Sequence, residues 1–142
     1  LMVATVESCT GGLIAGAITS VDGASAVLER GFTTYSNSAK CELVGVSAAL
    51  IDHEGAVSEE VARSMAEGAL AHAPVHAAIA VTGIAGPGGG SADKPVGLVH
   101  LAAARRGFET RHRCQVYPGD RHAVRQATLD DALRLLTDIV AR

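Results

Sequence analysis

The stretch AAIAVTGIAGPGGG, residues 77–90, decides the fold class of this chain of 142 residues. Its first five residues form an unbroken apolar run, which is typical of a β-strand buried on both faces of a sheet. Five of the 16 glycines of the chain then follow between Gly83 and Gly90. A buried strand that ends in a glycine-rich loop is typical of α/β proteins, which bind ligands at the carboxyl ends of their strands.

Hydrophobic spacing on both sides of this stretch predicts alternating strands and helices. Strands are expected at residues 2–6, 31–35, 77–81, 96–103 and 108–116, and helices at 13–20, 39–44, 48–53, 58–70 and 120–139. A tight turn at residues 105–107 joins the last two strands, so we expect this pair to be antiparallel and the sheet to be mixed. The expected architecture is an α/β fold, a three-layer α/β/α sandwich with a mixed β-sheet, in one domain over residues 1–142.

The composition argues against several classes of protein. Lys and Arg number 12 against 15 Asp and Glu, a net charge of −3, so no broad basic face is expected to bind nucleic acid. There is no Trp, and the two Phe and two Tyr are too scattered to form a base-stacking surface. No apolar run approaches the roughly 20 residues that a membrane span needs. Three cysteines without a CxxC spacing, and a start without the basic region of a signal peptide, favour the reducing cytoplasm.

The basic residues are strongly biased, because only Lys40 and Lys94 among the 12 are Lys. A buried Lys can lose its proton and act as a base, whereas Arg stays protonated. The two lysines are therefore candidates for a functional role, and two ordinary surface charges are the alternative.

Two turns that follow predicted strands are candidate ligand sites. In the loop from Thr82 to Pro95, glycine N–H groups can approach a phosphate or an oxyanion closely. This loop has neither a Gly-Lys-Ser/Thr P-loop motif nor GxGxxG, so ATP and dinucleotide sites are weakly supported, and a flexible connection is the alternative. The second turn, ESCTGG at residues 7–12, precedes a predicted helix that Thr10 and Gly11 are placed to cap, and the start of that helix favours an anion.

Metal-binding patterns are missing from the sequence. The six histidines form no HExxH motif, and the pair in His112-Arg113-Cys114 is more often incidental than a ligand set. Cys9 lies near a predicted helix start, where thiol pKa values are often lowered. No His stands at a recognisable spacing from it to serve as a base, so we interpret Cys9 as structural.

Five short motifs occur along the chain. They are ESCTGG at 7–12, YSN at 35–37, GAVS at 55–58, TGIAGP at 82–87 and KPVG at 94–97. Together they resemble the CinA carboxy-terminal domain family of competence/damage-inducible proteins, whose members include nicotinamide mononucleotide deamidases. The resemblance covers nearly the whole chain and implies the stand-alone form, without the separate amino-terminal domain of longer members.

The resemblance implies hydrolysis of the carboxamide of nicotinamide mononucleotide to nicotinate mononucleotide and ammonia, in pyridine-nucleotide recycling. This chemistry requires no cofactor or metal, so none is expected. The family is described as a serine amidase that uses a Ser-Lys pair with a Tyr. Matched by motif, the nucleophile is Ser25, the base is Lys40 and the relay is Tyr35. Spacing alone supports these three residues weakly, and Ser8 at a helix start is the rival nucleophile.

Three features compete to bind the phosphate of such a substrate, and the sequence does not rank them. They are the glycine-rich loop, the turn at residues 7–12 and Arg121. The oxyanion needs donors as well, for which loop N–H groups and Thr82 are the candidates. The full set of expected binding residues is Glu7, Ser8, Thr10, Gly11, Thr82, Gly83, Gly86, Gly88 and Arg121.

The alternative function is a module that binds a nucleotide or phosphate without catalysis, linked to competence or DNA damage. The same glycine-rich turns would serve it, but it would need neither Ser25 nor Lys40. Release of ammonia from nicotinamide mononucleotide distinguishes the two functions. In both cases we expect a homo-oligomer, and the sequence does not give the number of subunits.

Overall fold

A five-stranded mixed sheet forms the centre of the molecule, in the strand order β2-β1-β3-β4-β5. The computed structural model describes residues 1–142. The strands are β1 (Val3–Glu7), β2 (Leu28–Thr33), β3 (Ala77–Gly83), β4 (Leu98–Arg105) and β5 (Arg111–Val116). β1 pairs in parallel with β2 and β3, whereas β4 pairs antiparallel with β3 and β5. The expected mixed sheet is therefore confirmed.

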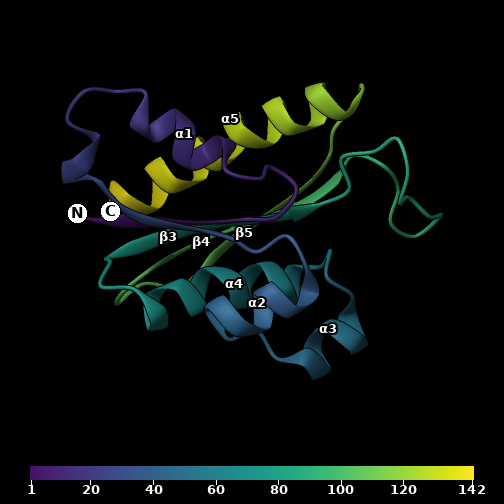
Figure 1. Cartoon of the computed structure of the whole chain (residues 1–142), viewed down its shortest axis with the longest axis horizontal. Helices are drawn as coiled ribbons and strands as arrows, with labels where there is room; N and C mark the ends of the chain where they lie inside the picture. The colour runs from purple at the N-terminus through teal and green to yellow at the C-terminus, as the bar shows by residue number, and fades with distance from the viewer.

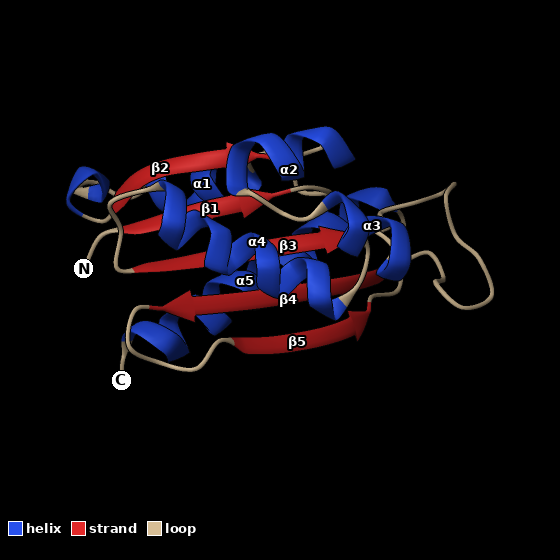
Figure 2. Cartoon of the chain, turned by 90° about the horizontal axis from the view of Figure 1, so that it is seen from below, coloured by secondary structure: helices blue, strands red, loops and turns tan.

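Helices cover both faces of this sheet, so the three-layer α/β/α sandwich is confirmed as well (Figure 1). Their bounds are α1 (Leu13–Thr19), α2 (Asn37–Val44), α3 (Ala48–Glu54), α4 (Glu59–His72) and α5 (Arg121–Val140), with the short 3₁₀ helix η1 (Ala24–Ala26). α1 and α5 lie on one face, and α2, α3 and α4 on the other. The arrowheads of β1, β2 and β3 point toward the end of the sheet where α3 lies (Figure 2). No helix has the length and apolar character to cross a membrane.

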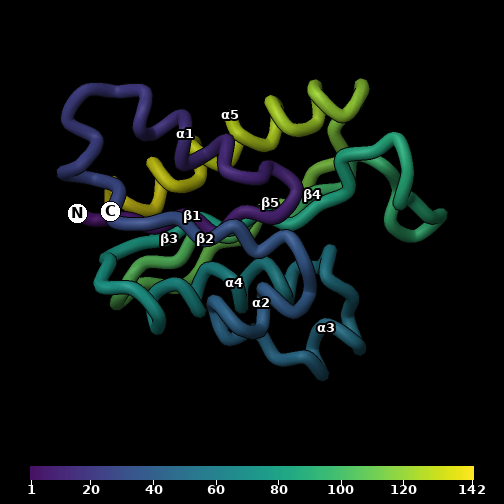
Figure 3. Tube along the Cα trace, in the orientation of Figure 1, coloured from purple at the N-terminus to yellow at the C-terminus, as the bar shows by residue number.

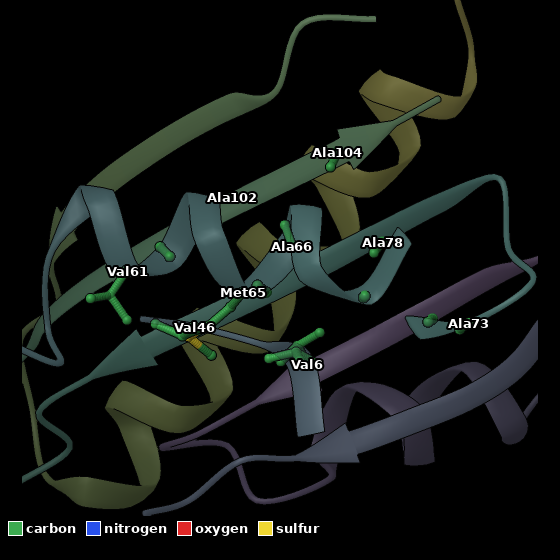
Figure 4. Packing of buried hydrophobic residues seen from close by; sticks show 14 of the residues in the cluster. Val6, Val46, Val61, Met65, Ala66, Ala73, Ala78, Ala102 and Ala104 are labelled. Atoms are coloured by element: carbon green, nitrogen blue, oxygen red, sulfur yellow. The ribbon is translucent and has the colours of Figure 1, made fainter. Parts of the chain in front are cut away.

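Small side chains dominate the core between the sheet and α4. Nine of the 16 buried residues of this cluster are Ala. Figure 4 shows Met65 and Ala66 of α4 lying over the sheet, where Ala78 and Ala102 contribute from β3 and β4. Because alanine adds little bulk, the helix and the strands can approach one another closely.

A similarly close contact joins α4 to α2. A Cβ added at Gly68 in α4 would lie only 1.9 Å from the carbonyl oxygen of Val44, the last residue of α2. Only a residue without a side chain fits there. Since α2 also carries Lys40, the packing of these two helices sets the position of that lysine.

β2 begins and ends earlier than the sequence predicts, at residues 28–33 rather than 31–35. Pairing with β1 sets both ends, because Val3 pairs with Leu28 and Glu7 pairs with Thr33. β4 and β5 form the expected antiparallel pair, with later starts than predicted. The residues at which a strand begins and ends thus depend on its pairing with the neighbouring strand, and the spacing of residues along the sequence does not show this pairing.

Gly68→Ala should destabilise the protein by about 1–3 kcal/mol, the usual cost of overpacking, because the new methyl group would push α2 away from α4. Gly16→Ala in α1 is the matched control, because a Cβ at that position meets no atom within 4 Å. The control should stabilise the protein by about 0.4–1 kcal/mol. Urea unfolding followed by circular dichroism measures both, and equal stability of the two variants would contradict the tight contact.

Candidate active site

A cavity of about 220 Å³ opens where the carboxyl ends of β1, β2 and β3 meet. Parallel strands deliver the segments that follow them to one edge of a sheet, which is where α/β folds place ligands. The lining comes from well-separated parts of the chain: Ser8, Cys9, Tyr35, Asn37, Lys40, Ala56, Val57, Thr82, Gly83, Ala85 and Arg121.

Lys40 contributes a buried amine to this cavity, with only 1% of the residue exposed. Ser36 begins α2 by accepting a hydrogen bond from the N–H of Ala39 at 3.0 Å. Lys40 Nζ donates to the carbonyl oxygens of Thr34 at 2.9 Å and Tyr35 at 3.5 Å. Burial lowers the pKa of the Lys40 ammonium from its ordinary value of 10.5, so the neutral amine forms more easily.

Ser8 lies next to this amine. Its Oγ is 3.3 Å from Lys40 Nζ, both residues are buried, and this hydroxyl has no other hydrogen-bond partner in the protein. A neutral amine that donates its two protons to the Thr34 and Tyr35 carbonyls keeps its lone pair for the Ser8 hydroxyl. A serine beside a neutral lysine is the arrangement of a nucleophile and its base.

The position of Ser8 depends on the preceding residue, Glu7. This carboxylate is buried and accepts hydrogen bonds from the first turn of α1, from Ile14 N–H at 2.8 Å and Ala15 N–H at 3.0 Å. A negative charge is favoured at this end of a helix, because the unpaired N–H groups there carry partial positive charge. Glu7 therefore fixes the turn that leads from β1 through Ser8 into α1.

The expected capping of α1 by Thr10 and Gly11 is wrong. Gly12 occupies the N-cap position and supplies no side-chain cap. The Thr10 hydroxyl instead donates to Glu7 Oε1 at 2.7 Å. The carboxylate, which is the stronger acceptor, takes the place of the hydroxyl cap.

Arg121, the first residue of α5, bridges two sides of the cavity. Its Nη1 donates to the Gly86 carbonyl at 2.9 Å, and its Nη2 donates to the Tyr35 hydroxyl at 3.1 Å. The glycine-rich loop is thereby tied to the segment that precedes α2. The hydroxyl of Tyr35 thus contacts Arg121, and it is the backbone carbonyl of Tyr35 that reaches Lys40.

Comparison with known proteins identifies the family of this chain. Residues 1–140 match the family model described as the CinA C-terminal domain. The chain belongs to this family. It spans about a third of the length of the curated CinA-like relatives it matches, such as that of Akkermansia muciniphila, which is 53% identical over 138 residues, 97% of this chain and 33% of the relative.

Two further CinA-related proteins are similar over most of their own length. The nicotinamide-nucleotide amidohydrolase PncC of Enterobacter agglomerans is 53% identical over 123 residues, which cover 87% of this chain and 75% of that protein. The crystal structure of a competence/damage-inducible protein from Agrobacterium tumefaciens superposes with a TM-score of 0.95 at 52% identity, over 97% of this chain and 84% of that one.

Ser25, the nucleophile by the CinA motif match, lies away from Lys40. Ser25 is in η1 before β2, whereas Lys40 follows β2, so the strand separates them. At roughly 3.3 Å a residue, the strand places its two ends roughly 17 Å apart. Ser25 lines a separate open hollow formed by residues 19–25 and Leu28. The structure therefore brings Ser8, and not Ser25, to the amine.

The other expected binding residues divide into two groups. Those that line the cavity are Ser8, Thr82, Gly83 and Arg121. Those that do not line it are Glu7, Thr10, Gly11, Gly86 and Gly88. The turn residues fall outside because their polar groups stabilise α1 and its start, and Gly88 lies in open space, with no atom within 4 Å of an added Cβ.

Sequence reasoning missed four cavity residues: Asn37, Ala56, Val57 and Ala85. A signal was present, since all four lie inside the motifs at 35–37, 55–58 and 82–87 that carry the CinA resemblance. Cys9 also lines the cavity, and burial raises the pKa of its thiol to about 11. The thiol is therefore protonated near neutral pH, as a structural role requires.

Glu7→Gln should destabilise the protein by about 1–3 kcal/mol, because one carboxylate oxygen that accepts from α1 is replaced by an NH₂ group that cannot. Glu42→Gln, an exposed site on α2, is the matched control and should stay within about 0.5 kcal/mol of the parent. Urea midpoints at neutral pH measure the difference. A Glu7→Gln variant as stable as the control would show that the cap contributes little.

Proposed function

We propose that this chain hydrolyses the carboxamide of nicotinamide mononucleotide to nicotinate mononucleotide and ammonia. Membership of the CinA family and the similarity to a protein named nicotinamide-nucleotide amidohydrolase support the substrate class. The observation that carries the proposal is the 3.3 Å contact between Ser8 Oγ and Lys40 Nζ. A buried hydroxyl whose one partner is an amine of lowered pKa suits amide hydrolysis through an acyl-enzyme.

In the proposed reaction, Ser8 is the nucleophile and Lys40 is the general base. Neutral Nζ takes the hydroxyl proton as Oγ bonds to the carboxamide carbon. Lys40 then returns this proton to the amide nitrogen, the C–N bond breaks, and ammonia leaves an ester on Ser8. Neutral Lys40 next takes a proton from the attacking water, and passes it to Ser8 Oγ as the ester bond breaks and the acid departs.

The backbone N–H of Cys9 suits the oxyanion that forms during these steps. It directly follows Ser8, its residue lines the cavity, and it forms no hydrogen bond with another residue. The Thr82 hydroxyl is a weaker candidate, because it already donates to the Ala56 carbonyl at 2.9 Å. One such preorganised donor contributes about 2.7–4 kcal/mol in other acyl-transfer enzymes.

Among the competing phosphate sites, the geometry favours Arg121. The N–H groups at the start of α1 that would attract an anion already donate to Glu7. Arg121 and Asn37 both line the cavity, and Asn37 is the first residue of α2. A guanidinium and the amino end of a helix both favour a phosphate.

Ammonia release tests the proposed function and its nucleophile together. The protein incubated with nicotinamide mononucleotide should release ammonia, measured by a coupled glutamate dehydrogenase assay. Ser8→Ala should lower kcat at least about 10³-fold, because the attacking oxygen is lost. Ser25→Ala is the matched control and should keep near-wild-type activity, because Ser25 lies in another hollow.

The opposite result, loss of activity in Ser25→Ala with Ser8→Ala active, would assign the nucleophile to Ser25. Mass spectrometry of a trapped acyl-enzyme identifies the labelled serine directly. Tight binding of the nucleotide without any ammonia would contradict hydrolysis and indicate a binding module.

The pH dependence of kcat/KM should report the ionisation of Lys40. Only the neutral amine accepts a proton and its pKa is lowered, so activity should rise with pH and level off below pH 10.5. Lys40→Arg keeps the positive charge but removes the base, so it should abolish activity while the circular dichroism spectrum is retained. Near-wild-type activity of this variant would exclude Lys40 as the base.

A further inference from the structure

Lys94, the second of the two lysines, belongs to the loop between β3 and β4. This loop projects from the end of the sheet where β3 ends and β4 begins (Figure 3). The cavity opens at the same end, since Thr82 and Gly83 of β3 line it. Gly97 N–H donates to the Ile84 carbonyl at 2.8 Å and closes the neck of the loop. Arg121 holds the adjoining Gly86 carbonyl at 2.9 Å. One side of the loop is thus fixed to α5.

Lys94 fixes the other side of the loop to α3. Its Nζ donates to the carbonyl of Glu54, the last residue of α3, at 2.7 Å. The ammonium fits because residue 55 is Gly, at which an added Cβ would lie 2.6 Å from Nζ. A cation is favoured at the carbonyl end of a helix by the helix dipole. The contact joins two segments that are 40 residues apart in the sequence.

The segment that follows this contact, residues 55–57, contributes Ala56 and Val57 to one wall of the cavity. Its carbonyl groups are held one after another. Ser58 Oγ donates to the Gly55 carbonyl at 2.8 Å, and Thr82 Oγ1 donates to the Ala56 carbonyl at 2.9 Å. The wall is therefore anchored at the end of α3 on one side and at β3 on the other.

We propose that Lys94 is a positioning residue of the active site, which holds the wall at residues 55–57 in place by fixing the Glu54 carbonyl. The proposal rests on the proposed deamidase function. It gives a task to the KPVG motif, which neither the Ser8–Lys40 pair nor the phosphate site uses. Because Lys94 does not line the cavity, it acts on the fit of the substrate and not on proton transfer.

Lys94→Met removes the ammonium and keeps the apolar stem. KM for nicotinamide mononucleotide should rise about tenfold and kcat should stay within about threefold, because the wall loosens while the reacting groups remain. The rise of activity with pH that reports Lys40 should be unchanged. Amide hydrogen exchange at the end of α3, where the Gly55 N–H donates to the Ile51 carbonyl at 2.8 Å, should become faster in the same variant, as mass spectrometry can measure.

Arg106→Met is the matched control. Arg106 donates to the carbonyls of Leu70, Ala73 and Val75 at the end of α4, outside the cavity lining. Its loss removes another cation from helix-end carbonyls, so thermal stability should fall while KM stays unchanged. If Lys94→Met does not fold, Lys94→Gln replaces it with the same expectation.

An unchanged KM in Lys94→Met, or an equal rise in Arg106→Met, would overturn the positioning role. A wild-type protein that releases no ammonia would contradict the proposed function instead. Hydrogen exchange then tests the anchor alone: faster exchange of the Gly55 N–H at the end of α3 in Lys94→Met supports it, and unchanged exchange overturns it.

Discussion

The hydrogen bonds from the start of α1 to the buried carboxylate of Glu7 are the interaction on which the site depends. β1 ends at Glu7 and α1 starts at Leu13, so only a short turn separates the Glu7 carboxylate from the N–H groups that begin the helix. By accepting from the first turn of the helix it fixes where Ser8 stands. Arg125 secures the same turn by donating to the carbonyls of Cys9 and Thr10, each at 3.2 Å. The backbone around Ser8 is therefore fixed by the side chains of Glu7 and Arg125, which leaves the Ser8 hydroxyl with Lys40 as its one partner.

Because the Glu7 carboxylate is engaged by α1, it forms no ion pair with the buried amine of Lys40. Lys40 contacts carbonyl and hydroxyl oxygens and forms no ion pair with Asp or Glu. A carboxylate at that position would raise the pKa of the amine and keep it protonated, whereas burial lowers it. Glu7 precedes Ser8 directly, yet its oxygens accept from α1 and not from Lys40. One buried acid and one buried base coexist because each has neutral partners.

Local patterns predicted the layers, the mixed sheet and several site residues. The apolar run at 77–81 and the tight turn before the last strand are enough to predict the architecture. Ser8 and Thr82 closely follow predicted strands, and Arg121 starts the last helix. The distances between these residues in the folded protein could not be predicted from the sequence. A motif places Ser25 and Lys40 fifteen residues apart in the sequence, but a whole strand runs between them. The cap by Glu7 and the wall at 55–57 depend on contacts between distant segments, which spacing along the chain does not encode.

The neck that Gly97 and Ile84 close has a consequence for how this domain can diversify. Because β4 returns antiparallel to β3, the loop leaves and re-enters the sheet at the same edge. Residues 88–93 lie beyond the neck, whereas Thr82 and Gly83 of the cavity lining lie before it, and Ala85 directly follows it. Insertions or exchanges in that tip would leave the strands and the reacting groups where they are. The tip of this loop can thus change in evolution without displacing the residues that line the cavity.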